Sequence, residues 1–159
     1  MDKQTIEKFY NAFSNLDAVK MTDSYHDDIT FTDPAFGVLK GQRAKAMWHM
    51  LCDSQKEKDF RIIYSDVSAK NNLGNAYWEA FYTFSKTGRK VHNKIEASFE
   101  FKDGLIINHT DVFSLHKWAK QALGFKGFVL GRTKYFQNKL KAQTNSLLDR
   151  YMNEKKLPR

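Results

Sequence analysis

The 159-residue chain has one cysteine, Cys52, and only two prolines. A single cysteine cannot form an intramolecular disulfide. This is typical of proteins from a reducing compartment, so we expect a cytoplasmic location. There is no run of about 18 apolar residues, so the sequence predicts no membrane-spanning helix. The first residues, Met1 to Ile6, contain no apolar core of a signal peptide.

The sequence also lacks the motifs of nucleotide binding and of serine hydrolases. It has no GxGxxG, P-loop or GxSxG pattern, so we expect no nucleotide cofactor. The five histidines include no pair at metal-ligand spacing, and His49 with Cys52 has no third ligand nearby. We therefore expect no metal site and no other cofactor.

The positive charge is concentrated near the end of the chain. The net charge is +8, but residues 124–159 hold nine basic and two acidic residues and so carry +7. The first 123 residues hold 17 basic and 16 acidic residues and carry +1. The high isoelectric point is thus a property of the tail, and we expect no specific nucleic-acid partner.

Helical patterns dominate the first third of the chain. Apolar residues at helical spacing predict a helix over residues 3–15, and Asp17 is suited to cap a second helix running to about Tyr25. Gly41 opens a third helix. Residues 115–123 predict another helical stretch, which Leu123-Gly124-Phe125-Lys126-Gly127 breaks. The last part, residues 132–155, predicts one long polar helix with a thin apolar stripe, made of Phe136, Leu140, Leu147 and Tyr151.

Strand patterns follow the helices. Residues 29–33 alternate and predict a short strand that ends at Pro34, followed by a loop over residues 35–40. Period-two patterns then predict four consecutive strands, over about residues 60–68, 75–85, 91–101 and 105–113. Helices segregated from an antiparallel meander predict an α+β fold with a curved sheet and a cone-shaped interior. Side chains fill such a cone, or it is left as a ligand cavity.

Several short motifs, taken in order, resemble the NTF2-like superfamily and, within it, the SnoaL-like polyketide cyclase group. They are Phe9-Tyr10-Asn-Ala12-Phe13 with Asp17, Tyr25 to Asp33-Pro34, Gly41, Gly88-Arg89-Lys90-Val91, Phe99 to Ile106, and His109-Thr-Asp111. Ketosteroid isomerase and limonene-epoxide hydrolase share this fold. The resemblance implies a domain over residues 1–124 and a separate basic helical tail over 125–159. The fold hosts enzymes and binding modules alike, so it does not decide the function.

Asp33 resembles the catalytic base of the ketosteroid isomerases, an Asp just before Pro. A carboxylate at the mouth of an apolar cone has a raised pKa, which suits proton abstraction beside a carbonyl. The alternative is an Asp-Pro turn that only ends a strand. The isomerases also need two oxyanion donors, but the matching positions here are Phe9 and Ala97, so this chain departs from them.

His109 and Asp111 lie two residues apart on the last strand, so both face the predicted interior. SnoaL-like cyclases carry a comparable Asp/His set, which implies that Asp111 and His109 form an acid–base pair with Asp33 as a second carboxylate. The alternative is a buried hydrogen-bonded pair that only orders the strand. An epoxide-hydrolase mechanism needs an Asp–Arg–Asp set. The inner positions of the strand over residues 91–101 are Asn93, Ile95 and Ala97, so this strand offers no Asp or Arg unless a bulge flips it.

Four further residues are candidates for contact with a ligand. Trp48 and Trp78 are expected in the cavity wall, although large aromatic residues are more often plain core. Asn93 has inner parity on its strand, and Tyr10 follows the position of one lost oxyanion donor. Together these residues predict a protein that binds a small apolar molecule. It is either a cofactor-independent cyclase or isomerase acting on a carbonyl compound, or a non-catalytic ligand-binding or dimeric scaffold module.

The meander is also expected to pair with a second copy. Its strands place aromatic residues on both faces, with Tyr77 and Phe81 on the face that the helices do not cover. A sheet that is apolar on both faces needs cover on both, which predicts a homodimer. The tail is expected to dock on a protein surface and to take no part in the pocket chemistry.

Overall fold

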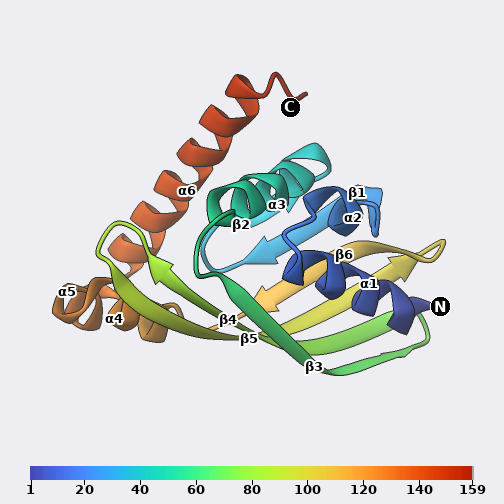
Figure 1. Cartoon of the computed structure of the whole chain (residues 1–159), viewed down its shortest axis with the longest axis horizontal. Coiled ribbons are helices and arrows are strands. Elements are labelled where there is room, and N and C mark those ends of the chain that lie inside the picture. The colour runs from blue at the N-terminus through green and yellow to red at the C-terminus, as the bar shows by residue number, and fades with distance from the viewer. Residues whose placement is uncertain (159) are drawn as a thin grey trace.

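The computed structural model describes residues 1–158 as a curved, unclosed six-stranded sheet with helices packed around it (Figure 1). The strands are β1 (Tyr25–Asp33), β2 (Gly37–Lys40), β3 (Arg61–Lys70), β4 (Leu73–Phe84), β5 (Arg89–Lys102) and β6 (Leu105–Val112). The helices are α1 (Asp2–Ser14), α2 (Ala18–Thr22), α3 (Gln42–Gln55), α4 (Leu115–Leu123), α5 (Phe125–Leu130) and α6 (Lys134–Glu154). The predicted α+β class is confirmed.

The sheet has the strand order β2-β1-β6-β5-β4-β3, and β1 and β6 are its one parallel pair. β3 to β6 form the predicted antiparallel meander. Two of its turns carry consecutive residues with positive φ, at Asn71-Asn72 (54° and 61°) and Asp103-Gly104 (53° and 77°). Positive φ at both central residues matches the twist of the flanking strands and keeps such hairpins tight.

The structure corrects the prediction for the edge of the sheet at two places. Residues 35–40 were predicted as a loop but contain β2, because Gly37, with φ 78°, turns the chain back along β1. Leu39 then pairs with Phe31 and is buried. β1 itself begins at Tyr25 rather than at residue 29, since Tyr25 pairs with β6.

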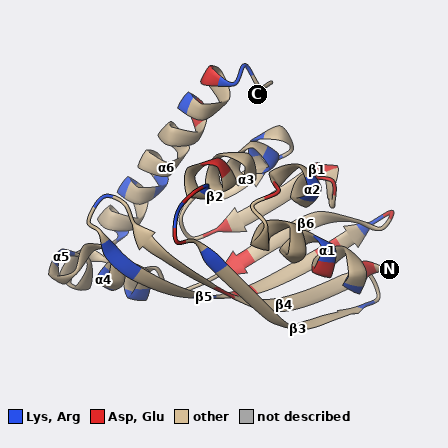
Figure 2. Cartoon of the chain, viewed as in Figure 1, with Lys and Arg blue, Asp and Glu red and all other residues tan. Residues whose placement is uncertain are grey.

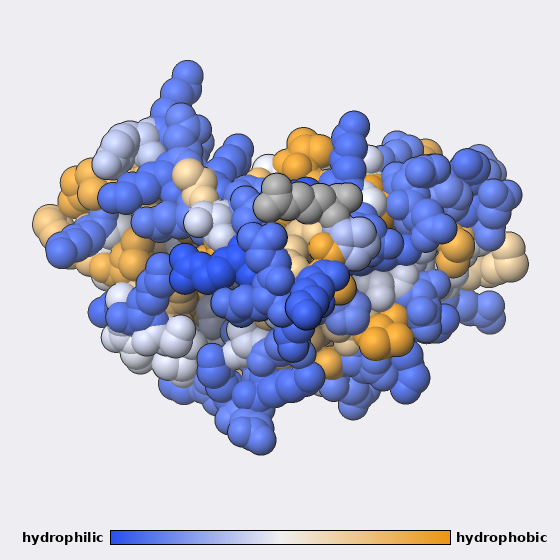
Figure 3. All heavy atoms as spheres, turned by 90° about the horizontal axis from the view of Figure 1, so that it is seen from above, coloured by the Kyte–Doolittle hydropathy of each residue, from blue (hydrophilic) through white to orange (hydrophobic). Residues whose placement is uncertain are grey.

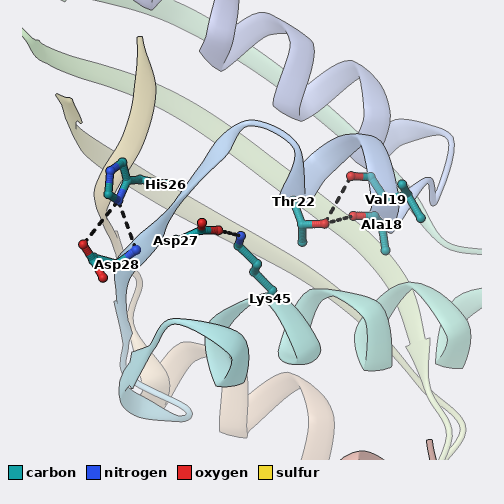
Figure 4. Close-up of polar contacts among 7 residues, drawn as sticks. All are labelled: Ala18, Val19, Thr22, His26, Asp27, Asp28 and Lys45. Carbon is teal, nitrogen blue, oxygen red and sulfur yellow. Dashed lines mark hydrogen bonds and ion pairs between the residues drawn. The ribbon is translucent and has the colours of Figure 1, made fainter. Parts of the chain in front are cut away.

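α2 consequently ends earlier than predicted. The hydroxyl of Thr22 lies 2.9 Å from the carbonyl oxygen of Ala18 and 3.1 Å from that of Val19, at the last turn of the helix (Figure 4). Beyond it, the ammonium of Lys45 on α3 lies 2.8 Å from a carboxylate oxygen of Asp27 on β1 (Figure 4). This contact joins α3 to the first strand.

The core lies between the concave face of the sheet and α1 and α3 (Figure 1). The ring centroid of Phe13 on α1 lies 5.2 Å from that of Trp48 on α3 and 5.5 Å from that of Trp78 on β4. All three side chains are buried. Burial of each such side chain stabilises the fold by about 1.5–3 kcal/mol, so this cluster fixes the helices on the sheet.

The chain after the sheet is helical, as predicted, but is divided differently. α4 and α6 match the predicted helices, while α5 occupies the segment predicted as a break. A Cβ atom on Gly127 would lie 1.8 Å from the carbonyl oxygen of Ala119, so the backbones of α4 and α5 touch at this point. Only glycine permits so close an approach.

α6 packs beside α3, and the residues that it buries most deeply are not members of the predicted stripe. Leu148 and Met152 are fully buried, whereas Leu147, a member of the stripe, is 43% exposed. Lys and Arg recur along the rest of α6 (Figure 2). The side of the molecule seen from above is mostly hydrophilic, with small apolar patches (Figure 3). No helix within residues 1–158 is long and apolar enough to cross a membrane.

Candidate functional site

A cavity of about 560 Å³ lies between the concave face of the sheet, α3 and α6. Its size is within the range of pockets that hold small organic ligands. The apolar part of the wall comes from several elements, with Phe13 on α1, Phe31 on β1, Met47 and Leu51 on α3, Ile95 on β5, and Leu140 and Leu147 on α6. The cone predicted from the sequence is therefore not filled by its own side chains.

Asp33 and Asp111 both line this cavity. In the parallel pairing of β1 with β6, Phe31 is the partner of His109 and Thr32 of Thr110, so Asp33 continues the row beside Asp111. Neighbouring strands are about 4.8 Å apart, which brings the two side chains to the same part of the wall. Acidic residues mark the adjacent ends of the two strands in Figure 2.

Burial is the main reason that the pKa of Asp33 rises from 3.8 to about 7. The negative charge of Asp111 adds to this rise. The backbone N–H of Phe36 donates to Oδ1 of Asp33 at 2.6 Å, which acts in the opposite direction. Near neutral pH the carboxyl group is therefore present in both forms, as a group that accepts and returns a proton must be.

His109 lies behind the cavity wall in a buried row of hydrogen bonds. Its Nε2 is 3.0 Å from Oδ1 of Asp111, and its Nδ1 is 2.6 Å from the hydroxyl of Tyr25. The indole N–H of Trp48 donates to that hydroxyl at 2.8 Å, and the indole N–H of Trp78 donates to Oδ1 of Asp111 at 3.3 Å. Five side chains from four elements thus form one continuous chain.

The donors and acceptors of this row fix the tautomer of His109. Because Trp48 donates to the oxygen of Tyr25, the proton of that hydroxyl is free to be donated to Nδ1 of His109. Nε2 then carries the ring proton and donates it to Asp111. Every polar atom from Trp48 to Oδ1 of Asp111 has a partner, while Oδ2 of Asp111 has no hydrogen bond from residues 1–158.

The prediction that His109 shares the pocket with both aspartates is wrong. His109 is buried on the inner face of the sheet, but it is not part of the cavity lining. Aromatic rings enclose it, with centroids 4.4 Å away for Phe99, 5.1 Å for Phe31 and 5.5 Å for Phe9. A substrate group therefore has no direct contact with the imidazole.

Of the four residues predicted to contact a ligand, some line the cavity and one does not. Trp48, Trp78 and Asn93 line the cavity, whereas Tyr10 does not. Tyr10 is fully buried and stacks on Tyr64, with 5.3 Å between the ring centroids. Its hydroxyl has no partner within the described residues, and burial raises its pKa. Tyr10 is therefore part of the core and not of the wall.

Two parts of the site were not predicted from the sequence. Tyr25 was assigned to the end of a helix, so its link to His109 was not foreseen. The tail was expected to take no part in the pocket chemistry, and its place in the wall was not predicted: Leu140, Leu147 and Tyr151 of α6 line the cavity. The i, i+7 and i, i+4 spacing of these three residues was a signal of a shared face, but it did not show that this face lines the cavity.

The described residues, 1–158, contain no cluster of three or more His, Cys, Asp or Glu side chains that could hold a metal ion. Besides its apolar wall, the cavity is lined by three carboxylates, three side-chain amides, three indole rings and three basic side chains: Asp33, Asp111 and Glu154; Gln55, Asn93 and Gln143; Trp48, Trp78 and Trp118; and Lys58, Lys86 and Arg150.

Solved structures with similar folds are numerous. One is TerC co-crystallised with polyporic acid, with 14% identity, a TM-score of 0.65, and coverage of 77% of this chain and 98% of the other. A second is an LEH-like epoxide hydrolase of M. tuberculosis, with 19% identity, a TM-score of 0.62, and coverage of 80% and 92%. A third is an NTF2-like protein from Burkholderia pseudomallei, with 15% identity, a TM-score of 0.64, and coverage of 76% and 96%.

At such identities these likenesses show the fold alone, and that fold is the predicted NTF2-like one. No curated protein matches the chain. The family model of the SnoaL-like domain matches residues 6–109, well over half of the sequence, and supports a small-molecule-binding protein. The chain belongs to the SnoaL-like domain family.

Proposed function

We propose that this protein is a cofactor-independent enzyme that moves a proton on an apolar carbonyl compound, in a cyclisation or an isomerisation. The observation that carries this proposal is the presence of Asp33, with a pKa of about 7, beside Asp111 in a largely apolar cavity. A base is most effective when its pKa is near the working pH, and such a base accelerates proton transfer by about 10²–10⁴-fold.

In this proposal Asp33 is the base. Its ionised form takes a proton from the carbon beside the substrate carbonyl, which leaves an enolate and a neutral Asp33. In an isomerisation, Asp33 returns the proton to another carbon of the same molecule. In a cyclisation, the enolate carbon bonds to a second carbonyl carbon, and Asp33 gives its proton to the new alkoxide.

The other cavity residues have supporting parts in the reaction. Asn93 lines the cavity, and its side chain has no hydrogen bond within residues 1–158, so its amide N–H is free to bind the enolate oxygen. Asp111 raises the pKa of Asp33 through its charge and presents Oδ2 to the substrate. His109 is a positioning residue here, because it touches Asp111 and not the cavity.

Binding is tested first. Trp48 and Trp78 line the cavity, so a bound ligand should change the tryptophan fluorescence. Polyporic acid, the compound in the TerC crystals, is a suitable first probe, followed by a panel of apolar diketones. Compounds that bind are then incubated with the protein, and the products are separated by chromatography and identified by mass spectrometry.

Variants decide whether chemistry takes place. Asp33→Asn should abolish product formation and leave binding nearly unchanged, because the amide has the same shape but cannot take up the proton. Asp23→Asn, at an exposed position outside the cavity lining, is the matched control. If Asp33→Asn forms product at the rate of wild type, the proposed mechanism is wrong. If ligands bind but wild type changes none of them, the protein is a binding module.

We also propose that the protein forms a homodimer through the outer face of the sheet in a reducing compartment. Ile63 on this face is 46% exposed, and Phe81 is only partly covered, by Arg61 and His92. Cys52 is buried, and burial raises the pKa of its thiol to about 12, so it is not poised for disulfide exchange. A monomeric mass from light scattering at micromolar concentration would refute the dimer.

A further inference from the structure

The helix α6 holds the turn that follows Asp33. The hydroxyl of Thr144 lies 2.8 Å from the carbonyl oxygen of Ala35, and the amide of Asn145 donates to the carbonyl oxygen of Phe36 at 2.9 Å. These two carbonyls belong to consecutive residues between β1 and β2. α6 lies outside residues 6–109, which match the SnoaL-like domain, so this contact joins the matched domain to a segment beyond it.

The same turn supplies the hydrogen bond that orients Asp33. The N–H of Phe36 donates to Oδ1 of Asp33 at 2.6 Å, while the carbonyl of Phe36 accepts from Asn145. The peptide groups on the two sides of Phe36 are thus held at one end by Asp33 and at the other by α6. A movement of α6 would therefore be transmitted to the carboxylate through one residue.

α6 is itself firmly attached to α3, so it is a suitable anchor. Arg43 of α3 pairs with Asp149, and its guanidinium also donates to the side-chain oxygen of Asn145 at 3.1 Å. Nearer the end of the helix, the hydroxyl of Tyr151 donates to Asp53 of α3 at 2.7 Å. Asn145 is therefore oriented by α3 on its oxygen while its nitrogen holds the turn.

We propose that Thr144 and Asn145 are positioning residues for Asp33, and that α6 is a structural part of the candidate active site. The proposal rests on the proposed function in one respect, which is that Asp33 is the reacting group. Neither side chain needs to touch the substrate, since their effect is transmitted through the turn between β1 and β2.

The expected effect of removing these contacts follows from the position of α6, which keeps water away from Asp33. If the two contacts are removed, the turn loses its tie to α6, and water gains access to Asp33 from the side of the cavity that α6 covers. Burial is the largest cause of the raised pKa of Asp33, so hydration should lower that pKa. Loss of the Phe36 N–H bond, and of the weaker backbone bonds from Ala35 and Gly37, acts in the opposite direction, but burial is the largest single cause of the shift.

The charged groups around the turn stay in place in the test variants. They are Asp111 on β6, Arg43 on α3, and Lys141 on α6, whose side chain lies close to Gly37. Thr144→Val and Asn145→Ala change none of these charges. A measured shift in the pKa of Asp33 would therefore report on position and hydration, and not on a lost ion pair.

The experiment compares four full-length proteins with wild type: Thr144→Val/Asn145→Ala, Thr144→Val alone, Thr144→Ser, and Ser146→Ala. The serine variant keeps the hydroxyl at position 144. Ser146 is the matched control site, because it is an exposed polar residue of α6 that directly follows Asn145. Carbon-detected NMR follows the titration of the Asp33 carboxyl. Hydrogen exchange of the Phe36 amide measures directly how firmly the turn is held.

We expect the double variant to lower the pKa of Asp33 by about one unit and to speed exchange of the Phe36 amide by about tenfold or more. Thr144→Val alone should change both in the same direction by less, so the test survives if the double variant does not fold. Thr144→Ser and Ser146→Ala should match wild type. Amide exchange at the wild-type rate in both valine-containing variants would overturn the proposal.

The two proposals fail separately. Turnover that survives Asp33→Asn would refute the role of Asp33 in catalysis, whatever the exchange of the Phe36 amide. A firmly held turn in the double variant, together with loss of turnover in Asp33→Asn, would refute only the role of α6.

Discussion

Asp111 and Asp33 lie on the neighbouring strands β6 and β1 but have different surroundings. Asp111 belongs to the buried row of hydrogen bonds, whereas Asp33 lies at the turn on the edge of the cavity. In the row, Oδ1 of Asp111 accepts two N–H groups, and both nitrogens of His109 have partners. At the edge, Asp33 lines the cavity, and its carboxylate accepts from backbone N–H groups of the turn, chiefly that of Phe36. Every polar atom of the row from Trp48 to Oδ1 of Asp111 is paired, although Trp48, Trp78 and Asp111 also line the cavity. The turn, in contrast, leaves a carboxylate whose pKa is about 7.

This difference distinguishes polar groups that stabilise the fold from a carboxylate that is suited to reaction. A buried polar group that is fully paired fixes the arrangement of its elements, because removal of one member leaves the others unpaired. A carboxylate in an apolar wall with few partners costs stability in its charged form but gains reactivity. The predictions below test this division, with stability as the measure for the row and pH dependence as the measure for the turn.

The largest effect is expected for His109→Leu. The change leaves the Tyr25 hydroxyl without an acceptor and removes one N–H donor from buried Asp111, so we expect a loss of about 4 kcal/mol in the free energy of unfolding. Urea denaturation measures it. Asn108→Ala, one residue earlier on the same strand, is the control and should cost less than about 1 kcal/mol. Equal losses of unfolding free energy in the two variants would show that the hydrogen bonds of the row do not stabilise the fold more than those of an ordinary strand residue.

A somewhat smaller effect is expected at Asp33, with a size that depends on pH. Its pKa is 3.8 when unfolded and about 7 when folded, so the folded state holds the proton more tightly. Well below pH 4 both states are protonated and Asp33 carries no penalty. As the pH rises from 4 to 7 and above, the folded state becomes less stable, because a charge must be kept in the wall.

The comparison of wild type with Asp33→Asn isolates this contribution. Because the side chain is partly exposed, we expect about 3 kcal/mol at pH 8, less than the full shift implies. At pH 4 the two proteins should have nearly equal stability, and at pH 8 the variant should be the more stable. Urea denaturation over this range measures the difference. A difference that does not change with pH would mean that Asp33 has an ordinary pKa, and the proposed base would be lost.

The sequence was sufficient for the parts of this site that depend on strand alternation. Because His109 and Asp111 are two residues apart on one strand, their common inner face followed directly, and the Asp-Pro pair placed Asp33 at the end of a strand. Strand alternation shows on which face of the sheet a residue lies, but not whether it reaches the cavity. It therefore did not show that Asp111 lines the cavity while His109 lies behind it.

The parts that were missed depend on contacts between distant segments. Tyr25 joins the sheet because β1 pairs in parallel with β6, about 80 residues later, and no local pattern reports such pairing. The same holds for α6, whose buried residues are Leu148 and Met152. An amphipathic pattern shows that a helix needs a surface, but it does not say which surface.

A smaller effect is expected for Tyr25→Phe. The ring remains, but the indole N–H of Trp48 loses its acceptor and Nδ1 of His109 loses its donor. Unpaired buried groups of this kind cost about 1–3 kcal/mol, so we expect a loss of about 2 kcal/mol in urea denaturation. Stability within about 0.5 kcal/mol of wild type would indicate that the two groups find other partners.

The smallest effect is expected for Tyr10→Phe, which makes the same chemical change at another buried tyrosine. The hydroxyl of Tyr10 has no partner within residues 1–158, whereas that of Tyr25 has two. Removal of an unpaired buried hydroxyl relieves a desolvation cost, so stability should stay the same or rise by up to about 1 kcal/mol. Because Tyr10 does not line the cavity, ligand affinity in the fluorescence assay should also be unchanged. A clear loss of affinity would show that the Tyr10 hydroxyl reaches the ligand, and the boundary between core and cavity wall would have to be redrawn to include α1 at this position.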